Sequence, residues 1–164
     1  MNNNLEYLKH IATFLTLSHR LITVAESCTG GLLSAALTTL PGSSEWFDRG
    51  FITYSNAAKK ELLGVSEDIL VHYGAVSEET AKAMAKGALQ NSHSHIALAI
   101  TGIAGPDGGS VEKPVGTVWF GLADKYGVSQ VTLQIFSGTR DSIREQAVSF
   151  ALHWLSAYFL EEKK

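Results

Sequence analysis

Short apolar runs rich in β-branched residues alternate along this 164-residue chain with longer segments whose apolar residues recur every three or four positions. The first pattern predicts buried strands and the second predicts amphipathic helices. Strands are expected at 20–25, 48–55, 95–101, 117–124 and 128–136. Helices are expected at 5–18, 30–40, 56–65, 77–90 and 140–160. This alternation limits the chain to a small set of α/β folds.

The order of these segments narrows the fold further. The last two predicted strands flank Lys125, Tyr126 and Gly127, so we expect a hairpin and an antiparallel strand pair. The earlier strands are separated by helical segments, which is typical of a sheet covered by helices. A chain of this length can bury a sizeable core. We therefore expect residues 1–164 to form a single domain, a three-layer α/β/α fold with a mixed sheet.

Charge and composition restrict the partners. The chain has 13 Lys and Arg against 16 Asp and Glu, a net charge of -3, and so lacks the basic excess of a typical nucleic-acid-binding surface. Its polar N-terminus has no signal-peptide core, and no apolar run approaches the ~20 residues that span a bilayer. A single cysteine, Cys28, excludes an intrachain disulfide. We expect a cytoplasmic protein that binds neither nucleic acid nor membrane.

Three predicted helices carry recognisable end signals. Pro41 and Gly42 are expected to stop the helix over 30–40. Asn56 is the expected N-cap of the next helix, and Gly64 is its expected stop. Ser77, followed by two glutamates, is the expected N-cap of the helix over 77–90.

The stretch TVAESCTGG, residues 23–31, places three side chains capable of nucleophilic attack between a predicted strand and a predicted helix. Ser27, Cys28 and Thr29 would lie at the carboxyl end of the strand, where open α/β sheets usually bind ligands. The helix start supplies unpaired N–H groups, and Gly30 and Gly31 allow close approach. Such a turn can hold a phosphate, or stabilise the oxyanion that forms when a serine attacks a carbonyl group.

Simpler interpretations of the same turn stay open. Ser27 or Thr29 can act only as a helix cap, which explains such residues well. Cys28 is more often a small buried apolar residue than a nucleophile, because no cationic neighbour that would activate it is visible in the sequence. Glu26 can orient a lysine or a ligand hydroxyl, or pair with a surface arginine.

A serine nucleophile needs a base. None of the six histidines falls in a triad signature, and His93 and His95 lack a third ligand at metal-site spacing, so we expect no metal. Lys59 is the alternative base, in the first turn of a helix capped by Asn56, where the positive helix end would lower its pKa. Lys60 points about 100° away and should face solvent. From spacing alone, a plain surface role for Lys59 remains the simpler interpretation.

Four motifs in order resemble one family: AESCTGGLLSAALTTLPGSS, GFITYSNAAKKELLGV, GAVSEETAKAMAKGA and AITGIAGPDGGSVEKPVGTVWFGLA. From about residue 5 to 160 the chain is similar to the carboxy-terminal domain of the CinA family. The resemblance implies a fold like that of anticodon-binding domains and a homodimer or higher homo-oligomer. It also implies hydrolysis of nicotinamide mononucleotide to nicotinate mononucleotide and ammonia, without a cofactor.

The resemblance assigns roles to the residues of these motifs. Ser27 would be the nucleophile, Lys59 the general base, and Tyr54 would lie between or beside them. Thr101 and the backbone N–H groups from Gly102 to Gly105 would cradle the substrate or complete the oxyanion hole. The implied substrate-binding residues are Glu26, Cys28, Thr29, Gly30, Gly31, Thr101, Gly102, Ala104, Gly105 and Arg140.

Two cations stand near the proposed substrate. Lys113 is expected to reach the phosphate, and Arg140 to bind the phosphate or the pyridine carboxamide. Alternatively, Arg140 is only a charge at the start of the last helix, an electrostatically unfavourable place for it. The main alternative to the enzyme is a non-catalytic nucleotide-binding or partner-docking module of the competence/damage-inducible type. Another is amide hydrolysis of a different small substrate.

Overall fold

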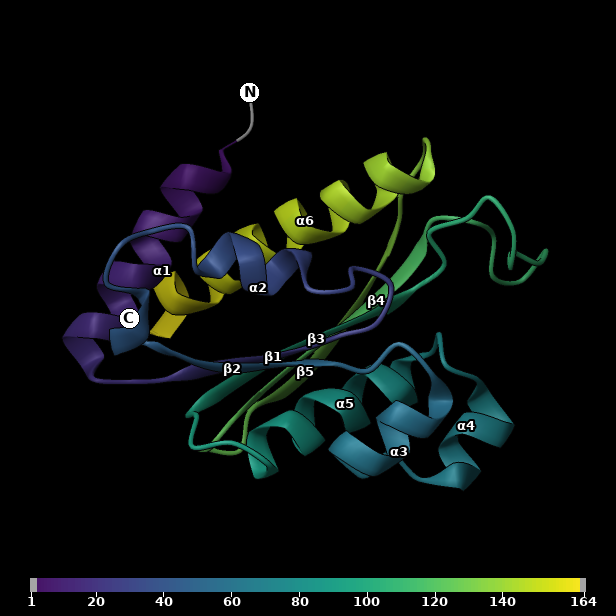
Figure 1. Cartoon of the computed structure of the whole chain (residues 1–164), viewed down its shortest axis with the longest axis horizontal. Helices are drawn as coiled ribbons and strands as arrows, with labels where there is room; N and C mark the ends of the chain where they lie inside the picture. The colour runs from purple at the N-terminus through teal and green to yellow at the C-terminus, as the bar shows by residue number, and fades with distance from the viewer. Residues whose placement is uncertain (1–2, 163–164) are drawn as a thin grey trace.

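A computed structural model describes residues 3–162 and shows a five-stranded mixed sheet between two layers of helices (Figure 1). The strands are β1 (Ile22–Glu26), β2 (Phe47–Ile52), β3 (Ile96–Gly102), β4 (Thr117–Asp124) and β5 (Ser129–Ile135). The helices are α1 (Asn4–Ser18), α2 (Leu32–Leu37), the short 3-10 helix η1 (Ser43–Glu45), α3 (Asn56–Leu63), α4 (Glu67–Tyr73), α5 (Glu78–Gln90) and α6 (Arg140–Glu162). The predicted three-layer α/β/α fold is confirmed.

The sheet topology gathers three strand ends at one edge. The strand order is β2-β1-β3-β4-β5, with β1 parallel to both β2 and β3 and the last two pairings antiparallel. The predicted hairpin of β4 and β5 is therefore confirmed. The chain leaves β1 toward β2 through α2 on one face, and returns to β3 through α3, α4 and α5 on the other (Figure 1). Such a reversal opens a crevice at the carboxyl ends of the strands.

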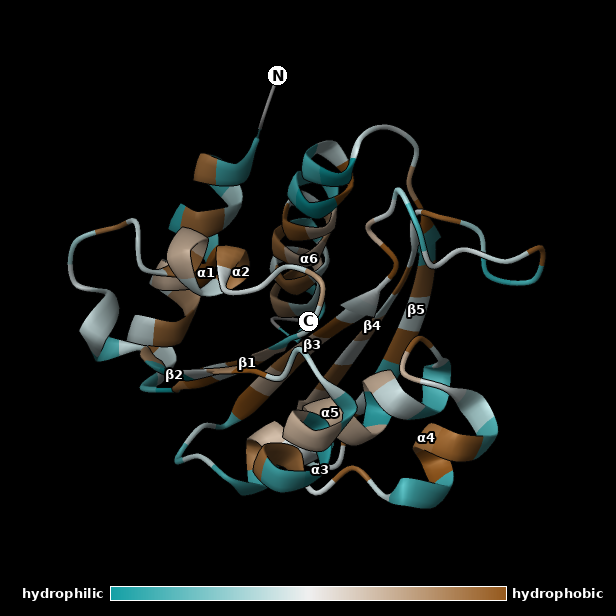
Figure 2. Cartoon of the chain, turned by 45° about the vertical axis from the view of Figure 1, so that its right-hand side comes forward, coloured by the Kyte–Doolittle hydropathy of each residue, from teal (hydrophilic) through white to brown (hydrophobic). Residues whose placement is uncertain are grey.

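The helices α1, α2 and α6 cover one face of the sheet, and their hydrophobic sides turn toward it (Figure 2). The larger apolar core lies here, because Ile96, Leu98 and Ile100 alternate along β3 with their side chains on this face. The smaller core lies on the opposite face, under α3, α4 and α5, and uses the intervening Ala97 and Ala99. Strand β3 is thus buried on both sides.

Small residues let α5 lie close to the sheet. A Cβ atom on Gly121 of β4 would stand 2.4 Å from the carbonyl oxygen of Ala81 in α5. The same helix lies equally close to α3, since a Cβ on Gly87 would stand 1.9 Å from the carbonyl oxygen of Leu63. These two contacts fix α3, by way of α5, against the sheet edge that carries the crevice.

Some predicted helix ends need correction. The helix predicted over 30–40 covers only Leu32–Leu37, because Gly30 and Gly31 have φ values of +57° and +106°, outside the helical region. Ser55, and not Asn56, is the N-cap of α3, since its hydroxyl accepts a hydrogen bond from the Ala58 N–H. Asn56 is the first residue of the helix itself.

Two predicted helix ends are confirmed, and one helix was not predicted. Gly64 ends α3 in the left-handed conformation and Ser77 caps α5, as predicted. Helix α4 was not predicted. It has seven residues, and Leu70 is its one buried side chain, so its sequence carries too few apolar positions for a helical period to stand out.

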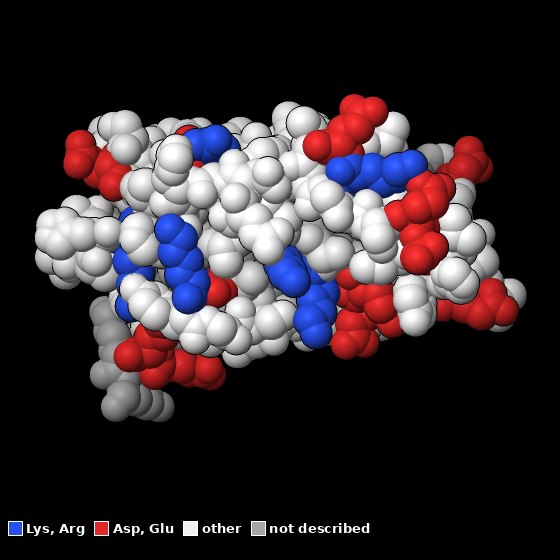
Figure 3. Space-filling model, turned by 90° about the horizontal axis from the view of Figure 1, so that it is seen from below, with Lys and Arg blue, Asp and Glu red and all other residues white. Residues whose placement is uncertain are grey.

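The surface carries both signs of charge. On the face formed by α3, α4 and α5, the lysine and arginine side chains stand in separate groups with acidic side chains beside several of them (Figure 3). Within residues 3–162, no helix combines the length and apolarity that crossing a membrane requires.

Candidate active site

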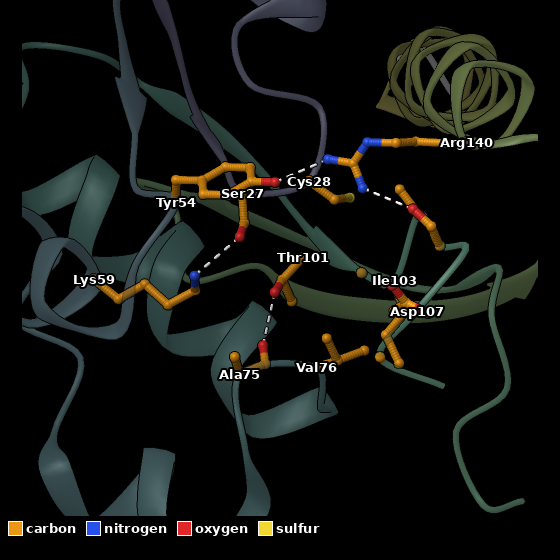
Figure 4. Close-up of a pocket in the computed structure, with 14 residues that line it drawn as sticks. Ser27, Cys28, Tyr54, Lys59, Ala75, Val76, Thr101, Ile103, Asp107 and Arg140 are labelled. Carbon is orange, nitrogen blue, oxygen red and sulfur yellow. Dashed lines mark hydrogen bonds between the residues drawn. The ribbon is translucent and has the colours of Figure 1, made fainter. Parts of the chain in front are cut away.

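A cavity of about 280 Å³ lies at the carboxyl edge of β1, β2 and β3, near the small end of the size range of ligand sites (Figure 4). It is lined by Ser27, Cys28, Tyr54, Lys59, Ala75, Val76, Thr101, Gly102, Ile103, Ala104, Gly105, Asp107, Gly108 and Arg140. These residues come from the ends of three strands, from α3, from the loop before α5, from the glycine-rich loop and from the start of α6. Both members of the predicted serine–lysine pair are among them.

Ser27 and Lys59 meet in this cavity. The Lys59 Nζ atom lies 2.9 Å from the Ser27 Oγ atom, although 32 positions separate the two residues in the sequence. Ser27 directly follows β1, and its N–H extends the strand pairing by donating to the Ile100 carbonyl. The Lys59 Nζ also donates to the carbonyl oxygen of Thr53, which directly follows β2, at 2.8 Å. The sheet edge therefore holds both groups that contact the amine.

Lys59 is buried rather than exposed on the surface of α3. Its side chain is 1% exposed and shares the inward face of the helix with Leu63, four residues later. Burial lowers the pKa of Lys59 to about 8, against a smaller electrostatic effect of Cys28 that raises it. The prediction of a lowered pKa is confirmed, but its stated cause was wrong, because desolvation is the dominant effect.

The positive end of α3 is not the main cause of the lowered pKa of Lys59. With Ser55 as the cap, Lys59 is the fourth residue of α3 and opens its second turn, where the influence of the helix end has declined. Lys60 behaves as predicted: its side chain is 45% exposed and pairs with Glu67.

Cys28 lies beside Ser27 but is a poor nucleophile. Burial raises the pKa of its thiol to about 11, so the sulfur stays protonated near neutral pH. The thiolate is the reactive form of cysteine. The protonated thiol, together with the 2.9 Å contact between the Lys59 Nζ and the Ser27 Oγ, favours the hydroxyl as the attacking group.

Tyr54 and Arg140 are joined by a hydrogen bond in the cavity lining. Arg140, the first residue of α6, donates from Nη2 to the Tyr54 hydroxyl at 2.9 Å and from Nη1 to the Gly105 carbonyl at 2.8 Å (Figure 4). Tyr54 is 60% exposed, and its hydroxyl points toward Arg140 rather than toward the serine–lysine pair. Tyr54 lines the cavity together with Ser27 and Lys59, as expected, although its hydroxyl bonds to Arg140 and to neither of them.

Thr101 closes the floor of the cavity. Its side chain is 1% exposed and donates to the Ala75 carbonyl at 2.7 Å, which ties the end of β3 to the segment before α5. The neighbouring Gly102, Ala104 and Gly105 line the cavity as predicted. Within the described part of the chain, the N–H groups of Ala104 and Gly105 have no recorded acceptor.

Four residues predicted to bind substrate lie outside the cavity lining: Glu26, Thr29, Gly30 and Gly31. Glu26 is fully buried, and its carboxylate accepts hydrogen bonds from the Thr29 hydroxyl and from the Leu33 N–H on one oxygen, and from the Ser34 N–H and hydroxyl on the other. With these four donors it anchors the start of α2. Its role is therefore to hold the turn, and not to contact a ligand.

Lys113 also lies elsewhere. Its Nζ donates to the Tyr73 carbonyl at 2.8 Å, so the expected contact with a phosphate in this cavity is corrected. Ile103 lies within the predicted stretch from Gly102 to Gly105, whereas the sequence interpretation assigned no role to Asp107 and Gly108, which stand in the glycine-rich motif. It also missed Ala75 and Val76, whose small apolar side chains give no chemical signal.

The described residues hold no cluster of three or more His, Cys, Asp or Glu side chains that could bind a metal ion. The expectation of a reaction without metal stays a prediction.

Comparisons with known proteins agree with the geometry. A family model described as the CinA C-terminal domain matches residues 5–159. The nicotinamide-nucleotide amidohydrolases PncC of Enterobacter agglomerans and Escherichia coli (strain K12) are 56% and 51% identical to this chain, each over 85% of both chains. The crystal structure of the competence/damage inducible protein CihA from Agrobacterium tumefaciens has a TM-score of 0.92 and 44% identity, covering 96% of both chains.

Proposed function

The chain belongs to the CinA C-terminal domain family, and from this premise we propose that it is a nicotinamide-nucleotide amidohydrolase. In this reaction the carboxamide of nicotinamide mononucleotide is hydrolysed to a carboxylate, giving nicotinate mononucleotide and ammonia. The observation that carries the proposal is the 2.9 Å contact between the Ser27 Oγ and the Lys59 Nζ in a cavity. Relatives named for the same activity support it.

The first half of the reaction forms an acyl-enzyme. Neutral Lys59 takes the Ser27 proton while the serine oxygen attacks the carboxamide carbon. The Thr53 carbonyl accepts one amine hydrogen and so helps to aim the nitrogen lone pair at the serine. The carbonyl π electrons move to the oxygen, which becomes the oxyanion. When the carbonyl re-forms, the carbon–nitrogen bond breaks, and the Lys59 ammonium gives its proton to the departing ammonia.

The second half hydrolyses the acyl-enzyme. Lys59, again neutral, takes a proton from a water molecule that attacks the ester carbon, and then returns that proton to the Ser27 oxygen. We propose the Cys28 N–H as one donor to the oxyanion, because Cys28 directly follows the nucleophile, lines the cavity, and donates this N–H to no other described residue. The N–H groups of Ala104 and Gly105, across the cavity, are the candidates for a second donor.

The charges around the cavity suit a pyridine nucleotide. Arg140 places a guanidinium at one side of the cavity. Among the described residues, Asp107 is the only acidic one that lines the cavity. The substrate carries a phosphate and a positively charged pyridinium ring. We propose that Arg140 binds the phosphate, since the guanidinium matches phosphate geometry. The carboxylate of Asp107 suits the pyridinium charge, which free nicotinamide lacks.

The proposal is tested by measuring ammonia release from nicotinamide mononucleotide. Ser27→Ala should lower kcat by about 10⁴-fold or more, because no other group can form the acyl-enzyme. Lys59→Arg should cause a comparable loss, because a guanidinium keeps the charge but cannot deprotonate. Lys60→Ala is the matched control and should keep its activity, since this neighbouring lysine faces solvent and pairs with Glu67.

The same measurements separate the alternatives. Equal losses in the Lys59 and Lys60 variants would mean that the base is misassigned. Wild-type protein that binds the nucleotide without releasing ammonia would favour the non-catalytic binding module. Faster ammonia release from another carboxamide would mean that this compound, and not nicotinamide mononucleotide, is the substrate. The serine–lysine mechanism would still apply.

We further propose that the chain acts in the cytoplasm as a homodimer or higher homo-oligomer, without a nucleic-acid partner. The family resemblance and the net charge of -3 support these assignments. The whole-molecule experiment described in the Discussion tests the oligomer.

A further inference from the structure

Arg144 contacts the backbone of the turn that follows Ser27. Its Nε donates to the Cys28 carbonyl at 3.0 Å, and its Nη2 donates to the Thr29 carbonyl at 3.3 Å. The two partners lie 116 and 115 positions away in the sequence, so α6 reaches across the molecule to make these bonds. Arg144 is not among the residues that line the cavity.

The bonds fix successive peptide units of the turn. In a trans peptide unit, the C=O of one residue and the N–H of the next point in opposite directions. Holding the Cys28 carbonyl therefore directs the Thr29 N–H away from Arg144. Holding the Thr29 carbonyl likewise directs the Gly30 N–H away, and this N–H donates to the Ser27 carbonyl at 3.1 Å. That last bond in turn sets the direction of the Cys28 N–H.

In this turn, the N–H groups of Cys28 and Thr29 have no hydrogen-bond acceptor in another described residue, although both residues are buried. The Cys28 N–H interacts only with its own side-chain sulfur. Buried N–H groups without a partner are rare and call for an explanation. An oxyanion formed on Ser27 would supply the acceptor during the reaction.

Gly30 lies against the guanidinium. Its φ is +57°, a conformation that favours glycine, and a Cβ atom there would touch the Arg144 Nη2 at 3.4 Å, an ordinary contact distance. The positive charge also polarises the two peptide units whose carbonyls it binds, which makes the N–H groups on their far sides stronger donors.

We propose that Arg144 is a positioning residue for the amidohydrolase reaction. It holds the peptide units of residues 27–30 in the arrangement that turns the N–H of Cys28, a residue of the cavity lining, toward the oxyanion. The inference rests on the proposed function, because it assigns a role within that reaction. It predicts that Arg144 acts on the transition state and not on substrate binding.

The test compares Arg144→Met and Arg144→Lys with Glu145→Gln, an exposed neighbour on the same turn of α6. Arg144→Met should lower kcat for nicotinamide mononucleotide by about 100-fold and change KM by less than about twofold. Arg144→Lys should recover part of the loss, about tenfold, because one ammonium can hold one of the two carbonyls. The pH midpoint of activity should stay at the wild-type value, since Lys59 is untouched.

The outcomes separate the two proposals. Wild type and Glu145→Gln that release no ammonia would overturn the proposed function, and the role of Arg144 with it. Active wild type with an unchanged kcat in Arg144→Met, or with a change confined to KM, would overturn the role of Arg144 alone. If Arg144→Met does not fold, Arg144→Lys decides by the same split between kcat and KM.

Discussion

At the scale of single residues, burial decides which lysine can act as a base. Lys59 and Lys60 are adjacent and chemically identical, but one is 1% exposed and the other has a side chain that is 45% exposed. Water stabilises the charged form of Lys60, whereas the cavity wall cannot do so for Lys59. The same burial has the opposite effect on the neighbouring thiol, because it raises the pKa of Cys28. The lowered pKa of Lys59 and the raised pKa of Cys28 together favour a neutral amine as the base and the Ser27 hydroxyl as the nucleophile.

The lowered pKa of Lys59 predicts the pH dependence of the reaction. A base works only when it is deprotonated, so kcat/KM should rise about tenfold per pH unit below the pKa of about 8 and level off above it. The measurement is kcat/KM for ammonia release between pH 6 and 9.5. A profile that is flat over this range, or that falls as pH rises, would contradict the assignment of Lys59 as the base.

At the scale of secondary-structure elements, close packing of helices places the base. Lys59 lies on α3, which makes its tightest contact with α5 where Gly87 meets the Leu63 carbonyl. Helix α5 in turn packs against the alanine-rich face of β3 and β4. The position of the amine relative to Ser27 therefore depends on small residues that carry no chemistry themselves.

Substitution of Gly87 tests this dependence. A Cβ at this position would stand 1.9 Å from a backbone oxygen, so Gly87→Ala must push α3 away from α5. We expect the free energy of unfolding to fall by about 1–3 kcal/mol. Activity should fall by about 100-fold in protein that is still folded, because a shift of about 1 Å between reacting groups is costly. Urea unfolding and ammonia release measure the two effects.

Lys86→Ala is the control for that substitution, since Lys86 is exposed on the same helix. It should leave both quantities near wild type. A Gly87→Ala variant with wild-type stability and activity would show that α3 is not held by this contact.

At the scale of the whole molecule, one sheet connects two apolar cores. The larger core under α1, α2 and α6 and the smaller one under α3, α4 and α5 both use β3, which is buried on its two faces. Unfolding of either helical layer would expose one face of β3 to water. We therefore propose that residues 1–164 behave as one domain.

Denaturation tests the single domain and the oligomer together. Urea unfolding should be one transition, coincident by far-ultraviolet circular dichroism and tryptophan fluorescence, because both cores share a strand. If the folded form is a homodimer, the midpoint should rise with protein concentration, since association stabilises only the folded state. Separate transitions for the two probes would contradict the single domain, and a midpoint independent of concentration would contradict the obligate oligomer.

The amino-acid sequence by itself determined the strands, most helices, the mixed sheet and the chemical identity of the serine and lysine. Period-two and helical spacing of apolar residues are local properties that can be read without a structure. Local spacing also placed Ser27 and Thr101 at strand ends. It predicted that Lys60 faces solvent but could not show that Lys59 is buried, because α3 has apolar residues at both 62 and 63, and only Leu63 is buried.

Only the tertiary structure decided which polar groups meet. It turned Glu26 toward the start of α2, Tyr54 toward Arg140, Lys113 toward Tyr73 and Arg144 onto the turn after Ser27. Each of these contacts except the first joins residues at least 40 positions apart. Hydrogen bonds and burial depend on distances in space, which a one-dimensional pattern does not contain, and the pKa of Lys59 follows from that burial.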